Sequence, residues 1–286
     1  MQEIIQKADV LLEALPYIQR FRSSIFVVKY GGSFMDSPDP KVRAGVAADT
    51  VFLEAAGINP VVVHGGGKAI TKAMEAAGIK AQFVNGLRVT DEETMKVVED
   101  VLANAINREI VETIQKLGGR ARSFNGRDVF HCEKLMKDGV DLGYVGEIVG
   151  VETEAVKKCL RASVTPVISP IGLGKDGHAY NINADVAAAK LAMVIGARRL
   201  VFMSDVPGLL REPKNPATLI SSLKVDEVLK LKQQGVIDKG MIPKVDSAVE
   251  AVRAGVHRVH FVDGRVPHSV LLEIFTDKGV GTEVVK

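Results

Sequence analysis

The sequence is poor in cysteine, contains no tryptophan and has no long apolar run. Its two cysteines, Cys132 and Cys159, form no C-x-x-C pair. This excludes a disulfide-rich scaffold and favours reduced or buried thiols in a cytoplasmic protein. No apolar stretch approaches the roughly 20 residues that span a bilayer. The first five residues lack the basic and apolar regions of a secretory signal, so we expect none.

A bias of charge is absent too. The 286 residues include 37 basic and 35 acidic side chains, which gives a net charge of +2. This balance gives no electrostatic reason to expect nucleic acid or an anionic membrane as a partner. The six histidines show no metal-ligand spacing, and neither an H-E-x-x-H motif nor a nucleophile elbow is present. We therefore expect no metal ion held by the protein's own side chains.

Glycine-rich turns, in contrast, directly follow two apolar runs. The turn Lys-Tyr-Gly-Gly-Ser at 29–33 follows the run 25–28, and His-Gly-Gly-Gly at 64–67 follows three valines. Such runs bounded by glycine are typical of buried strands in a parallel sheet. Ligands bind these sheets outside the carboxyl ends of the strands, where bare backbone N–H groups can approach an oxyanion. The two turns therefore predict a site that handles phosphate.

Alternating strands and helices predict an α/β fold with a mainly parallel sheet. Further strands are expected at 165–171, 200–203 and 259–262, and short antiparallel strands with turns within 123–163. Helices are expected at 2–19, 69–77, 183–195, 225–233 and 243–254, and from the capping-box pattern at 90–93 to residue 117. We place the boundary between two lobes at Gly196, with an appended helix within 1–24.

Two lysines stand where a bound anion would suit them. Lys29 ends a strand directly before two glycines. It is either solvated at the sheet edge or faces a phosphate held by the amides of Gly31 and Gly32. Lys244 follows Pro243, a favoured first helical residue, and a lysine in a first turn opposes the helix dipole. It is either an exposed lysine that tolerates this position or a second phosphate ligand.

The segment 181–185, Asn-Ile-Asn-Ala-Asp, leads into a predicted helix. Asn183 fits the N-cap and Asp185 fits an acid favoured by the helix dipole, which leaves Asn181 without a role. In the alternative interpretation, Asp185 orients nearby lysines and Asn181 donates to a substrate carboxylate. Arg88, just before another helix start, either lies at the surface or binds a carboxylate through its planar guanidinium.

Two glycine motifs resemble nucleotide-binding loops to different degrees. The three glycines at 65–67 open a helix, so their amides and the positive helix end favour the same anion. They are not a P-loop, because Val62 and Ala69 replace its first glycine and its Ser or Thr. The G-x-G-x-x-G match at 172–177 opens no helix and lacks an acidic residue about 20 residues later. We expect a loop there and no dinucleotide.

Together these segments resemble the amino acid kinase family from Lys29 to Lys244. The motifs, in order, are Lys-Tyr-Gly-Gly-Ser at 29–33, Val-His-Gly-Gly-Gly at 63–67, Asn-Gly-Leu-Arg-Val-Thr at 85–90, Asn-Ile-Asn-Ala-Asp at 181–185, Met-Ser-Asp-Val-Pro-Gly at 203–208 and Gly-Met-Ile-Pro-Lys-Val at 240–245. Each motif alone is weak, whereas the ordered set is specific. His-Gly-Gly-Gly combined with Asn-Gly-Leu-Arg is similar to the branch that phosphorylates N-acetyl-L-glutamate.

The resemblance implies a three-layer α-β-α sandwich with an acceptor-binding lobe at 25–195 and an ATP-binding lobe at 196–286. It implies transfer of the ATP γ-phosphoryl group to the side-chain carboxylate of N-acetyl-L-glutamate, an acyl phosphate step of arginine biosynthesis, with Mg²⁺ held by the ATP phosphates. Lys29 and Lys244 would neutralise the phosphoryl charge, and Asp185 would hold them. The further implied roles are acceptor binding by Gly66, Gly67, Arg88 and Asn181, and phosphate or nucleotide binding by Gly31, Gly32, Asn183, Ser204 and Asp205.

The N-terminal helix and the segment 260–279 resemble the arginine-inhibited members of this family, which are ring-shaped hexamers built from three dimers with interlaced helices. The resemblance implies arginine contacts at Tyr17, His260, Glu273 and Gly279, and it makes a nitrogen-signalling protein a candidate partner. Alternatively, the helix packs only on its own lobe. Two other functions stay open: a kinase of a related carboxylate such as carrier-linked aminoadipate, and a non-catalytic nucleotide or amino-acid sensor with this fold.

Overall fold

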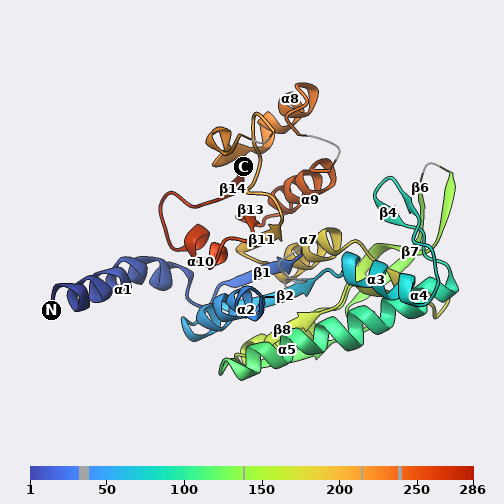
Figure 1. Ribbon diagram of the computed structural model, residues 1–286, viewed down its shortest axis with the longest axis horizontal. Coiled ribbons are helices and arrows are strands. Elements are labelled where there is room, and N and C mark those ends of the chain that lie inside the picture. Colours follow the sequence, from blue (N-terminus) through green and yellow to red (C-terminus); the bar gives the residue numbers. More distant parts are fainter. Residues whose placement is uncertain (32–38, 138, 214, 238–239) are drawn as a thin grey trace.

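The chain folds into three layers, with a central sheet and helices on both of its faces (Figure 1). The structure, a computed structural model, describes residues 1–31, 39–137, 139–213, 215–237 and 240–286. The predicted α/β class with a mainly parallel sheet is confirmed. No helix in the described ranges is long and apolar enough to cross a membrane.

The central sheet has eight strands in the order β12-β14-β13-β11-β1-β2-β8-β5. The strands are β1 (Ile25–Tyr30), β2 (Asn59–His64), β5 (Ala121–Phe124), β8 (Thr165–Ile168), β11 (Arg199–Ser204), β12 (Ser222–Lys224), β13 (Arg258–Asp263) and β14 (Thr282–Val285). Neighbours pair in parallel except β13 and β14. The carboxyl ends of β1, β2 and β11 therefore meet at one edge of the sheet.

Helices cover both faces of the sheet, which explains why the middle residues of its inner strands are mainly apolar. The helices are α1 (Gln2–Phe21), α2 (Pro40–Ala55), α3 (Gly67–Ala76), α4 (Glu92–Glu99), α5 (Asn107–Lys116), α6 (Glu154–Arg161), α7 (Ala184–Ile195), α8 (Val228–Gln233), α9 (Ile242–Arg253) and α10 (Ser269–Ile274). Helices α7 and α9 pack on the face that carries Val27 and Val61. Helices α2, α5 and α10 pack on the face that carries Val28 and Val62. Figure 1 shows α1 projecting from one end of the molecule.

A small closed barrel and a short hairpin lie beside the main sheet. The barrel strands are β6 (Phe130–Lys137), β7 (Val140–Val151), β9 (Ile171–Gly174) and β10 (Ala179–Asn181), and the hairpin strands are β3 (Phe83–Val84) and β4 (Leu87–Arg88). The G-x-G-x-x-G match at 172–177 forms the end of β9 and the turn into antiparallel β10. No helix opens on it, as expected, because its glycines belong to a β-hairpin.

The predicted long helix from residue 90 to residue 117 is interrupted. Its N-cap is Asp91, whose carboxylate accepts a hydrogen bond from Thr94 N–H. The capping-box prediction with Thr90 is wrong, because the Thr90 hydroxyl instead donates to the Arg88 carbonyl. Between α4 and α5 the chain forms a π-helical segment, Asp100–Ile106, which the apolar spacing did not reveal.

Three other elements differ from the prediction: one predicted strand is divided in two, and two helices were not predicted. The predicted strand 165–171 is two strands in different sheets, β8 and β9, because Ser169 and Pro170 break the ladder between them. Helix α6 lies within the region 123–163, where we expected only strands and turns. Helix α2 was not predicted, because its polar face is small and its sequence is only weakly periodic.

Candidate active site

Lys29 lies at the carboxyl end of β1 and is only 7% exposed, so it is not solvated at a sheet edge. Its side chain folds over Gly31: a Cβ built at that glycine would lie 2.0 Å from Lys29 Nζ. Any side chain at position 31 would therefore displace the ammonium group. Gly32, the other amide predicted for this turn, lies outside the described residues.

Asp185 stands in the first turn of α7, held there by two caps. The Asn183 side chain accepts hydrogen bonds from the N–H groups of Asp185 and Val186. Gly196 ends the helix in the left-handed conformation, with φ of 72°. The buried Asp185 carboxylate then reaches both lysines: Oδ1 lies 3.0 Å from Lys29 Nζ, and Oδ2 accepts a hydrogen bond from Lys244 Nζ.

Lys244 comes from the first turn of α9, which packs against α7. Its side chain is 21% exposed and pairs with Asp185, so it is not a free surface lysine. This carboxylate offsets the unfavourable position of a lysine near a helix N-terminus. The structure thus joins Lys29, Asp185 and Lys244, from three elements far apart in sequence, in one cluster.

The cluster carries an excess of positive charge, because two ammonium groups share one carboxylate. Burial lowers the pKa of Lys29 despite the opposing effect of Asp185. Burial also opposes ionisation of Asp185, but Lys29 and Lys244 outweigh it and bring its pKa to about 2. Asp185 is therefore ionised at neutral pH. A buried, net positive cluster of this kind favours a bound anion.

The second glycine turn stands directly beside Lys29. Gly65 N–H donates to Tyr30 O over 2.7 Å, which joins the turns after β1 and β2. A Cβ at Gly66 would lie 2.6 Å from atoms of Leu102 and Ile106, whereas one at Gly67 would meet open space. Gly66 is the N-cap of α3 and Gly67 its first residue, so this turn presents a helix N-terminus suited to an anion.

A cavity of about 260 Å³ opens between this turn, the β3–β4 hairpin and the start of α7. The charged residues among its described lining are Lys29, Arg88 and Asp185. Its apolar lining consists of Ile70, Phe83, Leu87, Leu102, Val145, Pro170, Ile182 and Ala184. A cavity with an excess of cations and apolar walls suits a small anion that carries an apolar group.

Arg88 and Asn181 both line this cavity. Arg88 is only 7% exposed, which rules out a surface position, and its guanidinium donates to Gly67 O over 2.9 Å and to Thr71 Oγ1 over 2.8 Å. Asn181 Nδ2 donates to Thr90 Oγ1 over 3.2 Å. The structure therefore places both predicted carboxylate ligands at one cavity.

The β3–β4 hairpin is a part of the site that the sequence analysis missed. Asn85 and Gly86 have φ of 49° and 79°, and an Asn-Gly pair with positive φ is the strongest short hairpin signal. The hairpin stacks Phe83 on Arg88, with 4.7 Å from the guanidinium carbon to the ring centroid. The Asn-Gly signal was present in the sequence, but the flanking strands are only two residues long.

Ser204 and Asp205 lie at the same sheet edge as Lys29. Strand β11 pairs with β1 so that Phe202 is opposite Lys29, and Ser204 follows two residues later. The Ser204 hydroxyl is buried and has no hydrogen-bond partner among the residues that the structure describes. The Asp205 carboxylate lies 3.8 Å from Lys68 Nζ, at the start of α3. An unpartnered buried hydroxyl beside a net positive cluster fits a phosphate-bearing ligand.

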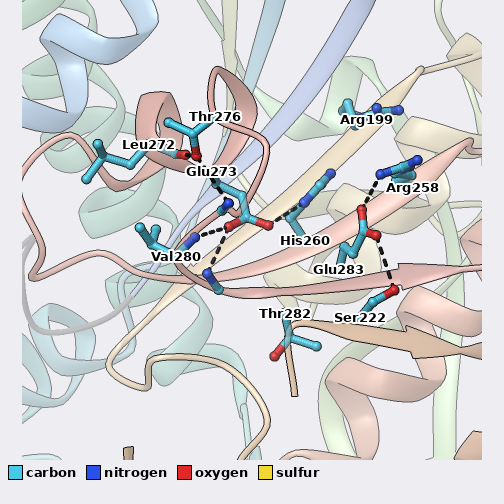
Figure 2. A network of polar contacts seen from close by, with 12 residues as sticks. Arg199, Ser222, Arg258, His260, Leu272, Glu273, Thr276, Val280, Thr282 and Glu283 are labelled. Carbon is cyan, nitrogen blue, oxygen red and sulfur yellow. Dashed lines mark hydrogen bonds and ion pairs between the residues drawn. The ribbon is translucent and has the colours of Figure 1, made fainter. Parts of the chain in front are cut away.

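A second cavity, of about 200 Å³, is lined by the first residues of β11 and β13 and by the end of α1. All four predicted effector residues, Tyr17, His260, Glu273 and Gly279, line it. His260 Nδ1 lies 2.8 Å from Glu273 Oε1, and Glu273 Oε2 accepts hydrogen bonds from Val280 and Gly281 N–H (Figure 2). The Tyr17 hydroxyl donates to Asp277.

This second cavity carries charges of both signs. Its basic lining consists of Arg20, Arg199, Arg258, His260 and Lys278, and its acidic lining of Glu273, Asp277 and Glu283. Burial and the neighbouring Arg258 lower the pKa of Arg199 to about 10. Arg258 forms an ion pair with Glu283, and the Glu283 carboxylate also accepts a hydrogen bond from the Ser222 hydroxyl (Figure 2). The cavity therefore suits a zwitterionic ligand.

The sequence and structure have clear relatives. A sequence profile of the amino acid kinase family matches residues 24–263. Acetylglutamate kinase from Heliobacterium modesticaldum is 46% identical over the full length of both chains, and the enzyme of the same name from Aquifex aeolicus is 48% identical over 99% of each chain. These similarities cover every motif that forms the site.

Solved structures share the fold. An N-acetylglutamate synthase from Neisseria gonorrhoeae, in complex with coenzyme A and N-acetylglutamate, superposes with a TM-score of 0.86 at 27% identity. The match covers 96% of this chain and 62% of that one, so the chain spans less than two thirds of the synthase. A carbamate kinase from Giardia lamblia bound to AMP-PNP has a TM-score of 0.67 at 17% identity, a likeness of fold.

Proposed function

The chain belongs to the amino acid kinase family, and from this we propose that it transfers the γ-phosphoryl group of ATP to the side-chain carboxylate of N-acetyl-L-glutamate. The observation that carries the proposal is the pairing of Asp185 with both Lys29 and Lys244, in a cluster whose Lys29 and Asp185 line the first cavity. The full-length relatives named acetylglutamate kinase support the choice of acceptor.

The acceptor cavity suits this substrate. N-acetyl-L-glutamate carries two carboxylates and an acetyl group, and the cavity offers cationic groups from Lys29 and Arg88 among apolar walls. Arg88 and Asn181 bind the α-carboxylate in this account. The side-chain carboxylate then points toward Lys29. Its oxygen is already a nucleophile, so no general base is needed.

Catalysis in this account rests on positioning and charge. Lys29 and Lys244 neutralise the charge that develops on the transferring phosphoryl group, and Asp185 keeps both ammonium groups in place. The amides of Gly66 and Gly67 donate to phosphoryl oxygens, as do those of Gly31 and Gly32 in the first turn. Asn183, Ser204 and Asp205 serve the nucleotide side. We assign 25–195 to the acceptor and 196–286 to ATP.

Mg²⁺ is the metal this chemistry calls for, and it would neutralise the ATP phosphates that hold it. Asp185 is engaged by two lysines. Among the described residues, no group of three His, Cys, Asp or Glu side chains could hold a metal ion.

The direct test is acyl phosphate formation, trapped as the hydroxamate, with ATP and Mg²⁺. N-acetylglutamate, glutamate, aspartate and carbamate serve as separate acceptors. We expect turnover with N-acetylglutamate and little with the others. Turnover on a different acceptor would reassign the substrate, and no turnover on any would favour a carrier-linked acceptor or a sensor.

The second cavity is proposed to bind arginine as a feedback inhibitor. Its acidic groups suit a guanidinium, and its arginines suit a carboxylate. A structure of the related gonococcal synthase is a complex with L-arginine, at 26% identity. Arginine should inhibit the hydroxamate reaction, and Tyr17→Ala should raise the arginine concentration for half-inhibition several-fold. Equal arginine sensitivity of the two proteins would contradict this assignment.

A further inference from the structure

A buried polar pair, His64 and Asn107, lies outside the two-lysine cluster and has no role in the account so far. His64 ends β2 and Asn107 begins α5, and both are 0% exposed. The Asn107 amide nitrogen lies 3.2 Å from His64 Nε2 and 3.0 Å from Val167 O on β8. His64 Nδ1 lies 3.1 Å from Gly65 O. The pair thus ties the glycine turn to α5 and to a neighbouring strand.

These contacts fix the protonation of the histidine. A carbonyl oxygen only accepts, so His64 Nδ1 must carry the hydrogen and donate to Gly65 O. The Asn107 amide donates to Val167 O, so its second N–H points at an unprotonated His64 Nε2. Burial lowers the pKa of His64 to about 4, which keeps the ring neutral. A protonated ring would set an N–H donor against the Asn107 amide.

The titratable and charged groups on the face of His64 come from β1, α2 and α5. On α2, the buried Asp49, whose pKa is raised to about 6 by burial, pairs with His268 Nδ1 over 2.6 Å. Side chains alternate along β1 and β2, so His64 lies on the face of Val62, and Lys29 with Asp185 lie on the opposite face. On β1, the Tyr30 hydroxyl donates to Val46 O. On α5, Arg108 and Glu109 are exposed, and Glu109 pairs with Arg43 of α2.

An apolar wall holds the other side of the glycine turn. Leu102 and Ile106 belong to the π-helical segment that immediately precedes Asn107. Their side-chain ends lie 2.6 Å from the place where a Cβ on Gly66 would stand. A π-helical turn inside a long helix is rare and frequently occurs at functional sites. Here it brings Leu102 and Ile106 against the turn while Asn107 faces His64.

We infer that His64 and Asn107 are positioning residues that hold the Gly65–Gly67 turn where its amides meet the transferring phosphoryl group. The inference rests on the proposed kinase function. Neither side chain lines the acceptor cavity among its described lining residues, so the effect passes through the backbone of the turn. A displacement of about 1 Å at such a turn can cost about 100-fold in rate.

Asn107→Ala is the first test, with Gln115→Ala as its matched control. Gln115 lies on the same helix, and its amide likewise donates to a strand carbonyl, Ala121 O, at 3.2 Å, far from the turn. Asn107→Ala should lower kcat about tenfold to 100-fold with little change in the KM for ATP, because amides that act in the transition state leave substrate affinity alone. Gln115→Ala should keep wild-type kcat.

Asn107→Asp is nearly isosteric and keeps the test informative if the alanine variant folds poorly. A carboxylate against His64 Nε2 raises the pKa of the imidazole. The protonated ring would donate from Nδ1 to Gly65 O and from Nε2 to the new carboxylate, which restores the contact that holds the turn. The kcat of this variant should therefore rise as the pH drops from 8 to 6, and the wild type should show no such rise. A structural role alone would lower the melting temperature and leave kcat and its pH profile unchanged for the folded protein, which would overturn the inference.

Two further readouts separate this inference from the proposed function. ¹⁵N spectra of the wild type at pH 7, with His64→Gln to assign the signals, should show His64 as the neutral Nδ1–H tautomer. Another tautomer or a charged ring would overturn the inference without any turnover. The double variant His64→Gln/Asn107→Ala should be no slower than the slower single variant, because the two act as one unit. If the loss in kcat of the double variant equals the product of the two single losses, the residues do not act as one unit and the inference is wrong. A wild-type protein without turnover would instead contradict the proposed function.

Discussion

Single residues decide where the charges of this site lie. Lys29 reaches Asp185 only because position 31 has no side chain, since a Cβ there would overlap the ammonium group. Asp185 keeps its charge in a buried place because two lysines flank it. The site therefore depends as much on the missing atom of Gly31 as on the lysine itself.

Gly31→Ala tests this dependence. The added methyl group should push the Lys29 ammonium away from Asp185 and lower kcat about tenfold to 100-fold, with the protein still folded. Steady-state kinetics of the hydroxamate reaction and a melting curve measure the two quantities. Wild-type kcat in a folded Gly31→Ala protein would show that Lys29 can take another path.

The site residues that could be predicted from the sequence are those marked by a local pattern, that is, by the residues next to them in the chain. Asn183 before a helix, glycines after a strand and Lys244 beside Pro243 are local patterns, and the structure brings these residues to one site. The stack of Phe83 on Arg88 and the contact between His64 and Asn107 were not predicted. The His64–Asn107 contact joins segments that tertiary packing brings together, so no local pattern marks it. The Phe83–Arg88 stack lies within one hairpin, whose Asn-Gly signal was overlooked because the strands are so short.

At the scale of elements, helix ends position the chemistry. Helix α7 begins at the Asn183 cap and ends at Gly196, and its first turn carries Asp185. These local signals are strong, and the predicted limits of this helix agree with the structure. The π-helical segment between α4 and α5 has no comparable signal, because its residues also suit an α-helix.

Substitution by alanine should change the unfolding free energy in opposite directions at Gly196, the C-cap of α7, and at Gly45 inside α2. Gly196 has φ of 72°, where a Cβ costs about 1–2 kcal/mol, so Gly196→Ala should lower the unfolding free energy by that amount. Gly45 lies inside α2, and a Cβ there meets nothing within 4 Å. Gly45→Ala should therefore raise the unfolding free energy by about 0.5–1 kcal/mol. Urea denaturation measures both, and equal signs would refute the stated cause.

At the scale of the whole molecule, helix α1 exposes large apolar side chains that the rest of the chain does not cover. It projects from the body (Figure 1). Its Val10, Leu11 and Leu12 are each more than 60% exposed. Large apolar side chains exposed together in this way are typical of an interaction surface. We propose that the partner is the same helix of a second copy, which interlaces dimers into a hexamer.

Leu12→Asp tests that assembly, with Glu13→Lys as a control on the same helix. A charge on the apolar face should convert hexamers to dimers, because it would be buried unpaired between two helices. Light scattering coupled to size exclusion gives the mass of each species. A wild-type protein that is dimeric, or a Leu12→Asp protein that stays hexameric, would contradict interlaced helices.

The central claim is that two lysines held by one carboxylate neutralise the transferring phosphoryl group, and it is tested most directly by kcat on N-acetylglutamate for Lys29→Ala and Lys244→Ala. Lys72→Ala, which removes an exposed lysine of α3, is the control. We expect each of the first two variants to remain folded and to lose about 10²–10³-fold in kcat, and the control to keep the wild-type rate. Near-wild-type rates in both Lys29→Ala and Lys244→Ala would contradict the account.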